Sequence, residues 1–270
     1  MKEDNIKAVE EAIEGWEYMA QLPDHIGDFQ LRRMCEPVDD RYELYSYTDE
    51  KRHRSVTVYF HEETMEYKLR VKVNLIEFCR IEFIAAKLDA FEGLLRQQFE
   101  GLIQELTSFD PRTISGIVRR KGILDWEAAQ ELPAELEGFT LDIRPDQPVR
   151  INNGSCIIID YVDDSISSSV TLYYNIYRDE FFGEAYIWGV PDVTYEFDAQ
   201  TLEDFEARLN ERLQPRMQQV RRMAADVVKQ RENKARVEAE EEELREWGER
   251  ERQQWEQTHG KKEDDDAGNR

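Results

Sequence analysis

The chain has 270 residues, of which 40% are hydrophobic and 11% aromatic, and its formal net charge at pH 7 is −23. This length is sufficient for two domains of ordinary size, each with its own core. A surface this acidic repels phosphate groups, so we expect neither direct nucleic-acid binding nor docking to an anionic membrane. No apolar run approaches the ~20 residues that span a bilayer, and the first residues lack the apolar stretch of a signal peptide, so a cytoplasmic protein is expected.

The sequence contains an internal duplication. The segment Ser55–Phe60 (Ser-Val-Thr-Val-Tyr-Phe) returns as Ser169–Tyr174 (Ser-Val-Thr-Leu-Tyr-Tyr). Residues 47–106 align without a gap with residues 161–220 and share 15 identities in 60 positions. Upstream the offset is four residues smaller, so the second copy has a longer loop near Pro148 than the first has near Pro37. Such an ordered match indicates two copies of one folding unit.

Helix and strand patterns follow the same order in both copies. A first helix is predicted over residues 3–21, stopped by Pro23, with a shorter counterpart at 125–131. Alternating segments rich in β-branched and aromatic residues then predict strands at 28–34, 42–48, 55–61, 66–73 and 79–84, and again at 138–144, 156–162, 169–177, 181–188 and 193–197. Helices with an apolar stripe are expected to begin near 88 and near 202.

Short polar connections favour an antiparallel meander in each copy, with the flanking helices covering its apolar face. The residues expected on that inner face of the first copy are Val56, Val58, Phe60, Leu69, Val71, Ile81 and Phe83. The predicted fold class is α+β: a tandem duplication of a unit made of a helix, an antiparallel β-meander of about five strands and a helix.

The last fifty residues have a different composition. From Arg221 to His259 the sequence is rich in Lys, Arg, Glu and Gln, which predicts a long charged helix that continues the preceding one, with a possible kink at Pro215. Pairing as a coiled coil stays open, because no apolar heptad is sustained. We therefore expect repeat 1 over 1–110, repeat 2 over 111–220, a charged helical extension over 221–259 and a disordered tail over 260–270.

The histidines offer a candidate metal site. His61-Glu62-Glu63 has the beginning of a zinc-protease motif, but position 65 is methionine where the second histidine would be needed. His53 and His61 flank one predicted strand with Glu63 nearby, which could form a weak metal site. Exposed strand-end histidines without a ligand are the commoner case, so no metal and no cofactor is predicted.

The other reactive side chains have structural interpretations. The three cysteines, Cys35, Cys79 and Cys156, are an odd number without close spacing, which argues against a disulfide framework and a thiolate zinc site. Cys79 opens a predicted strand and is expected in the core. Asp160, Asp163 and Asp164 lack the spacing of a calcium-binding loop and are expected to form an acidic hairpin. No catalytic motif is found.

The two copies differ most on the sheet face that points away from the helices. On the strand at 66–73 this outer face carries Lys68, Arg70 and Lys72. The matching residues of repeat 2 are large and aromatic, and they suggest a partner-binding surface made of Tyr173, Tyr177, Phe182, Tyr186 and Trp188. The alternative is that this face is buried within the molecule, against repeat 1 or the C-terminal helix.

These patterns favour a non-enzymatic acidic protein-interaction module, an adaptor or chaperone-like protein, that binds a protein partner through the outer sheet face of repeat 2. One alternative is an acidic inhibitor or immunity-type protein that neutralises a basic toxin or nuclease. Another is an enzyme with a site in the cleft between the repeats, which would draw on Glu82, Glu196 and His61. The sequence specifies neither the partner nor the oligomeric state.

Overall fold

The computed structural model describes residues 1–259, so the tail predicted over 260–270 lies outside the described residues. The chain divides into one compact unit over Met1–Val220 and a second unit that begins at Arg221. The first unit contains both repeats, each with its own antiparallel sheet. The α+β class predicted from the sequence is confirmed.

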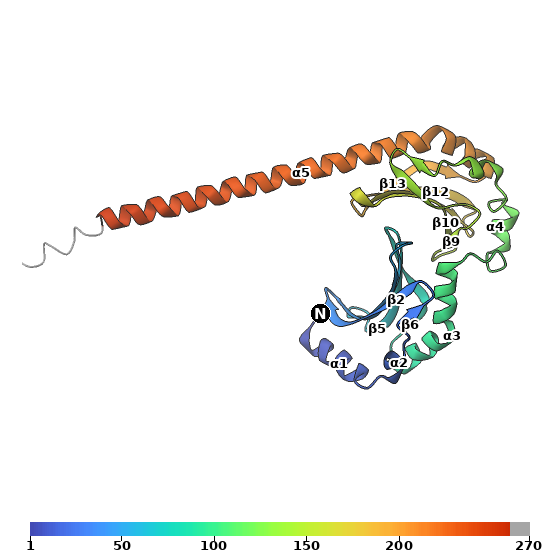
Figure 1. The fold of residues 1–270 in the computed structure, drawn as a ribbon, viewed down its shortest axis with the longest axis horizontal. Coiled ribbons are helices and arrows are strands. Elements are labelled where there is room, and N and C mark those ends of the chain that lie inside the picture. The colour runs from blue at the N-terminus through green and yellow to red at the C-terminus, as the bar shows by residue number, and fades with distance from the viewer. Residues whose placement is uncertain (260–270) are drawn as a thin grey trace, which may run out of the picture. The chain divides into compact units, whose positions relative to one another are not determined.

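Repeat 1 folds as short helices, a six-stranded meander and a long helix (Figure 1). Its elements are α1 (Glu3–Ile13), α2 (Glu17–Ala20), β1 (His25–Ile26), β2 (Phe29–Val38), β3 (Arg41–Asp49), β4 (Arg54–His61), β5 (Glu66–Val73), β6 (Ile76–Ala85) and α3 (Leu88–Thr107). We call the sheet of β1 to β6 sheet 1. The prediction of one helix over 3–21 is wrong, because Gly15 takes a left-handed backbone with φ of +72° and separates α1 from α2.

Repeat 2 follows the same order. Its elements are α4 (Gly116–Arg120), the 3-10 helix η1 (Glu127–Glu131), β7 (Glu135–Leu136), β8 (Phe139–Ile143), β9 (Val149–Arg150), β10 (Ser155–Asp163), the 3-10 helix η2 (Asp164–Ile166), β11 (Ser168–Asn175), β12 (Glu180–Ile187), β13 (Val190–Ala199) and α5 (Leu202–His259). Sheet 2 has seven strands in the order β13-β12-β11-β10-β8-β7, with β9 paired to β10. The predicted strands are all present, and β1, β7 and β9, with two residues each, are additional.

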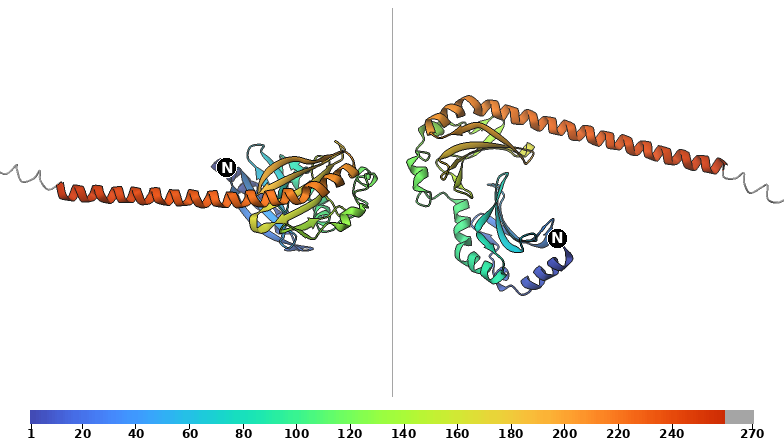
Figure 2. Two further views of the ribbon diagram at one scale, coloured as in Figure 1. Left: turned by 90° about the horizontal axis from the view of Figure 1, so that it is seen from above. Right: turned by 180° about the vertical axis from the view of Figure 1, so that it is seen from behind.

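Helices cover the inner face of each sheet. Figures 1 and 2 show α1, α2 and α3 along one side of sheet 1, and the beginning of α5 along one side of sheet 2. Phe91 and Phe99 of α3 are fully buried against sheet 1. At the start of α5, the ring of Phe205 stacks on Phe181 of β12 with centroids 4.6 Å apart. The predicted apolar stripes therefore close the two cores.

Equivalent hydrogen bonds confirm the duplication. The indole of Trp16 donates to Glu92 Oε2 at 2.7 Å, and the indole of Trp126 donates to Glu206 Oε2 at 2.6 Å. Two further equivalent bonds, of 2.6 and 2.7 Å, run from tyrosine hydroxyls to proline carbonyls: Tyr47 to Pro23 and Tyr161 to Pro133. The identities shared by the two copies thus tie the segment that precedes each sheet to the sheet itself and to the helix that follows it.

One inner-face assignment is wrong. Ile81 was expected to point toward the helices, but it is 64% exposed. The pairing of β5 with β6 is irregular between Lys68 and Arg70: Lys68 lies opposite Ile84, whereas Arg70 lies opposite Cys79. The extra residues on β6 interrupt the alternation of faces, so Ile81 points outward while Phe83 stays buried.

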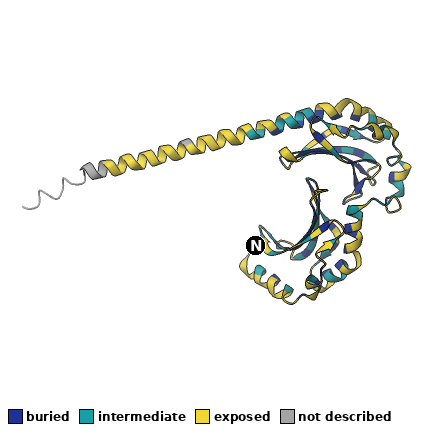
Figure 3. Ribbon diagram, in the orientation of Figure 1, coloured by how far each residue is buried: buried dark blue, intermediate teal, exposed yellow. Residues whose placement is uncertain are grey.

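The second unit is the distal part of α5. Every described residue from Lys229 to Gln254 is exposed (Figure 3). Pairs such as Lys234 with Glu238, at 3.6 Å, and Arg250 with Glu246, at 3.2 Å, follow the spacing that supports a solvated helix. In the described part of the chain, no helix combines the length and the apolar character needed to cross a membrane.

Candidate interaction surface on sheet 2

The outer face of sheet 2 receives the hairpin between β5 and β6. Asn74 lies at the turn of this hairpin with a left-handed φ of +52° and is only 6% exposed. Its amide nitrogen donates to two carboxylates of repeat 2, to Asp160 Oδ2 at 2.8 Å and to Asp142 Oδ2 at 2.9 Å. Asparagine suits this position because it tolerates the left-handed backbone and carries two side-chain donors.

Asp160 is the most deeply buried acid in this contact, with no exposed surface. Burial raises the pKa of its carboxyl to about 7, and the nearby Asp142 acts in the same direction. Hydrogen bonds from Thr171 Oγ1, at 2.7 Å, and from Asn74 partly offset this shift. The acidic hairpin expected around Asp160 is therefore divided: Asp163 is half-buried at the end of β10 and Asp164 is exposed in η2, whereas Asp160 points into the interface between the repeats.

Three of the predicted aromatic residues take part in this internal contact. Tyr173 is 2% exposed and belongs to the same buried cluster as Val73 and Ile76 of the β5–β6 hairpin. Phe182 and Tyr186 are half-buried and pack against that cluster, and the rings of Tyr173 and Phe182 stack with centroids 4.8 Å apart. Part of the aromatic face thus serves to hold the two repeats together.

The longer loop of repeat 2 completes this interface. Val149 of β9 is buried in the shared cluster, and Arg150 binds Glu105 of α3 through two hydrogen bonds of 3.1 and 3.2 Å. Asn152, just after β9, donates to the carbonyl oxygen of Cys79. The extra residues that distinguish the second copy therefore lead into a segment that contacts the first.

The other two predicted residues lie at opposite ends of β12. Tyr177 is in the β11–β12 turn and is 79% exposed. Trp188 is half-buried in the β12–β13 turn, at the position equivalent to Asn74, and its φ is also +52°. The five residues therefore do not form one continuous patch, and a partner-binding role for them stays a prediction.

Sequence analysis missed the apolar residues of β13. Val193 lies opposite Glu184 of β12 and Pro191 lies opposite Tyr186, which places both on the outer face. Val193 is 64% exposed and Tyr195 is 76% exposed. The predicted strand began only at residue 193, so the alternation Pro191, Val193, Tyr195 was not recognised. A proline that is compatible only with an edge strand was the available signal.

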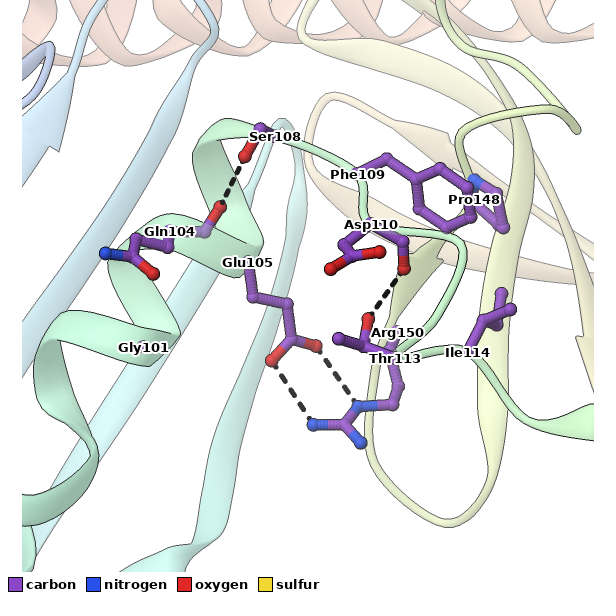
Figure 4. A pocket seen from close by; sticks show the side chains of 10 residues that line it. All are labelled: Gly101, Gln104, Glu105, Ser108, Phe109, Asp110, Thr113, Ile114, Pro148 and Arg150. Atoms are coloured by element: carbon purple, nitrogen blue, oxygen red, sulfur yellow. Dashed lines mark hydrogen bonds and ion pairs between the residues drawn. The ribbon is translucent and has the colours of Figure 1, made fainter.

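A cavity of about 390 Å³ lies between the end of α3, the segment that follows it, and β9 (Figure 4). Its charged groups are already paired. Glu105 accepts hydrogen bonds from Arg150 and also from Arg80, at 3.3 Å, and Asp110 is held by Arg112 at 2.8 Å. Those bonds from Arg112 hold the pKa of Asp110 below its ordinary value. The lining therefore offers no activated base or nucleophile.

The residues considered for an enzyme site have separate partners. Glu82 pairs with Arg80 at 3.3 Å, the backbone carbonyl of Glu196 accepts from Arg208 at 3.5 Å, and His61 lies beside Asp40. His53, at the other end of β4, faces Asp164 at 3.4 Å, so it does not join His61. Burial raises the pKa of the half-buried Cys79, which does not favour a reactive thiolate.

No protein-family model, no curated protein and no solved structure matches this chain.

Proposed function

We propose that the chain is a non-enzymatic protein-interaction module whose partner binds the open margin of sheet 2, defined as Phe182, Tyr186, Val193 and Tyr195. The observation that carries this proposal is the exposure of Val193, 64%, which lies opposite Glu184 between the half-buried Phe182 and Tyr186 of the neighbouring strand, and of Tyr195, 76%, two residues further along β13. The margin continues a face that already forms a packed contact with repeat 1. Apolar surface next to such a contact is typical of protein interfaces.

The charges around the margin indicate what kind of partner fits. Glu184 lies on the outer face between Phe182 and Tyr186, and residues 111–220 carry 10 basic against 20 acidic side chains. A partner segment that places arginine or lysine beside apolar side chains would satisfy both features. Arginine suits this site because it stacks on aromatic rings and also pairs with carboxylates.

The duplication supplies a matched control for the test. Tyr195 and Ile81 occupy equivalent positions, and both are exposed, at 76% and 64%. Baits of the wild type, of Tyr195→Asp and of Ile81→Asp should be compared in pull-downs from the native host. We expect a partner that is recovered with the wild type and with Ile81→Asp, and that binds Tyr195→Asp at least tenfold more weakly when purified. Equal binding by all three baits would show that the open margin does not bind the partner.

The acidic inhibitor is the second candidate, because repeat 1 is as acidic as repeat 2, with 14 basic and 24 acidic residues in 1–110. Its complex would depend on long-range attraction and would weaken steeply between low and high salt. Binding at the open margin depends mainly on apolar contact around a single carboxylate, so it would weaken much less over the same range. A steep salt dependence together with full binding by Tyr195→Asp would favour the inhibitor and contradict our proposal.

A further inference from the structure

Two turns meet at one end of sheet 1 and bring three potential metal ligands together. The backbone N–H of Glu62, just after β4, donates to the carbonyl of Asp40 in the β2–β3 turn at 2.9 Å. One ligand atom from each of Asp40, His61 and Glu63 lies within 4.8 Å of the other two. Asp40 and His61 are half-buried, and Glu63 is exposed. The group thus combines one imidazole with two carboxylates and remains open to solvent.

Hydrogen bonds determine how the His61 ring is oriented. Its Nδ1 lies 3.1 Å from Thr64 Oγ1, and its Nε2 lies 3.1 Å from Asp40 Oδ2. A neutral imidazole carries its single ring proton on one of these two nitrogens, and the other nitrogen presents a lone pair. When the proton is on Nδ1, the ring donates to Thr64 Oγ1 and the lone pair of Nε2 points toward Asp40.

In this tautomer the ring and the Asp40 carboxylate can share one cation. A neutral ring protonated at Nδ1 has its lone pair on Nε2, which faces the Asp40 carboxylate. Two acceptors at hydrogen-bonding distance repel each other unless a proton or a metal ion lies between them. The bond from Nδ1 to Thr64 is also the outer contact that usually fixes a metal-binding histidine.

We propose that His61 Nε2, Asp40 and Glu63 bind one divalent transition-metal ion of the zinc class, with the remaining coordination positions open to water. Imidazole and carboxylate ligands suit zinc, whereas magnesium and calcium prefer oxygen ligands alone. Ligand atoms around a tetrahedral zinc lie about 3.4 Å apart, so the exposed Glu63 side chain has to move only slightly. The site is confined to repeat 1, because the residues equivalent to His61 and Glu63 are Asn175 and Tyr177.

The test is a calorimetric titration of the full chain with Zn²⁺ in excess Mg²⁺, which suppresses non-specific binding to an acidic surface. Three variants accompany the wild type. His61→Asn introduces the residue that repeat 2 has at this place, His53→Ser does the same at the other end of β4, and Asp39→Asn removes a neighbouring carboxylate outside the group. We expect one ion per chain, at least tenfold weaker binding by His61→Asn, and control variants within twofold of the wild type.

Cobalt provides a second readout, because tetrahedral Co²⁺ with a nitrogen ligand gives a visible absorption band. The band should form with the wild type and be lost with His61→Asn, while thermal unfolding of the metal-free proteins shows that both are folded. If His61→Asn binds Zn²⁺ as tightly as the wild type, the proposal is wrong. If the wild type shows no site above the Mg²⁺ background, the proposal is equally wrong. Neither result bears on the open margin of sheet 2.

Discussion

The two hairpins that close the sheets show how the copies have diverged. The β5–β6 turn and the β12–β13 turn are equivalent in the fold, and Asn74 and Trp188 both have φ of +52°. Asn74 is buried against repeat 2 and binds two of its carboxylates. Next to Trp188, by contrast, Val190 is 64% exposed. The same hairpin therefore occurs in both repeats, and the two differ in what the turn residue contacts.

The outer sheet faces explain this difference. On sheet 1 the basic residues are matched by nearby acids: Arg70 binds Glu43 at 3.0 Å, and Lys68 binds Glu66 at 3.2 Å. On sheet 2 the equivalent positions carry Glu184 and Phe182, and the face is mainly aromatic. Removing water from an aromatic surface costs little free energy. Ion pairs that a docking hairpin separates would have to be desolvated at a much larger cost. Sheet 2 is thus suited to receive a hairpin, and sheet 1 is not.

The strongest test of this asymmetry makes one substitution at both turns. Asn74→Gly keeps the left-handed backbone but removes the amide from Asp160, so we expect the free energy of unfolding at pH 8 to fall by about 3 kcal/mol. Trp188→Gly relieves the strain of a bulky residue at positive φ and loses a half-buried ring, so the net change should stay within about 1 kcal/mol. Urea unfolding of both variants measures the difference. Equal losses in the free energy of unfolding would mean that the contact of Asn74 with repeat 2 does not set the two turns apart.

A pH series then isolates the buried acid in the docked contact. Burial raises the pKa of Asp160 to about 7 in the folded state, while in the unfolded chain it is near 4. Between these values the folded state holds a proton that the unfolded state has lost, so stability falls as the pH rises, by at most about 1.4 kcal/mol per pH unit.

Asp160→Asn removes the titrating carboxyl. Comparing this variant with the wild type cancels the contribution of the other acids to the pH dependence of stability. We expect the wild type to lose about 1.5 kcal/mol relative to Asp160→Asn between pH 5.5 and pH 7, measured by urea unfolding. The stability of Asp163→Asn, a variant at the end of the same strand, should follow that of the wild type across this pH range. If the stability of Asp160→Asn also followed that of the wild type across this pH range, the pKa of Asp160 would be an ordinary one.

The smallest expected effect concerns the inner faces. Position 69 is a fully buried leucine, whereas its equivalent is Gly183. A Cβ on Gly183 would lie 2.7 Å from the ring of Phe197 and 2.8 Å from Leu172. Gly183→Ala should therefore destabilise the protein by about 1–2 kcal/mol through overpacking. Gly93→Ala in α3, where a Cβ meets nothing within 4 Å, should instead stabilise it by about 0.5–1 kcal/mol in thermal or urea unfolding.

Prediction succeeded where the signal was local. The strand 66–73 has the bounds expected from its alternation, and its inner positions Leu69 and Val71 are buried as predicted. Two-residue strands such as β9 are too short to show alternation, and the irregular pairing that turned Ile81 outward depends on the neighbouring strand. The alternation also identified Phe182 and Tyr186 as outward-pointing, but the cluster that partly buries them includes a hairpin about a hundred residues earlier in the chain.

The sequence by itself determined the duplication, the order of helices and strands, and the chemical contrast between the two outer faces, because these follow from residue spacing and side-chain type. Only the tertiary structure decided that Asn74 meets Asp142 and Asp160, that Tyr173 is buried while Tyr195 is exposed, and that Asp40 joins His61. Alternation fixes the face on which a side chain lies. The segment that packs on that face is chosen by contacts between distant parts of the chain, and these leave no periodic pattern.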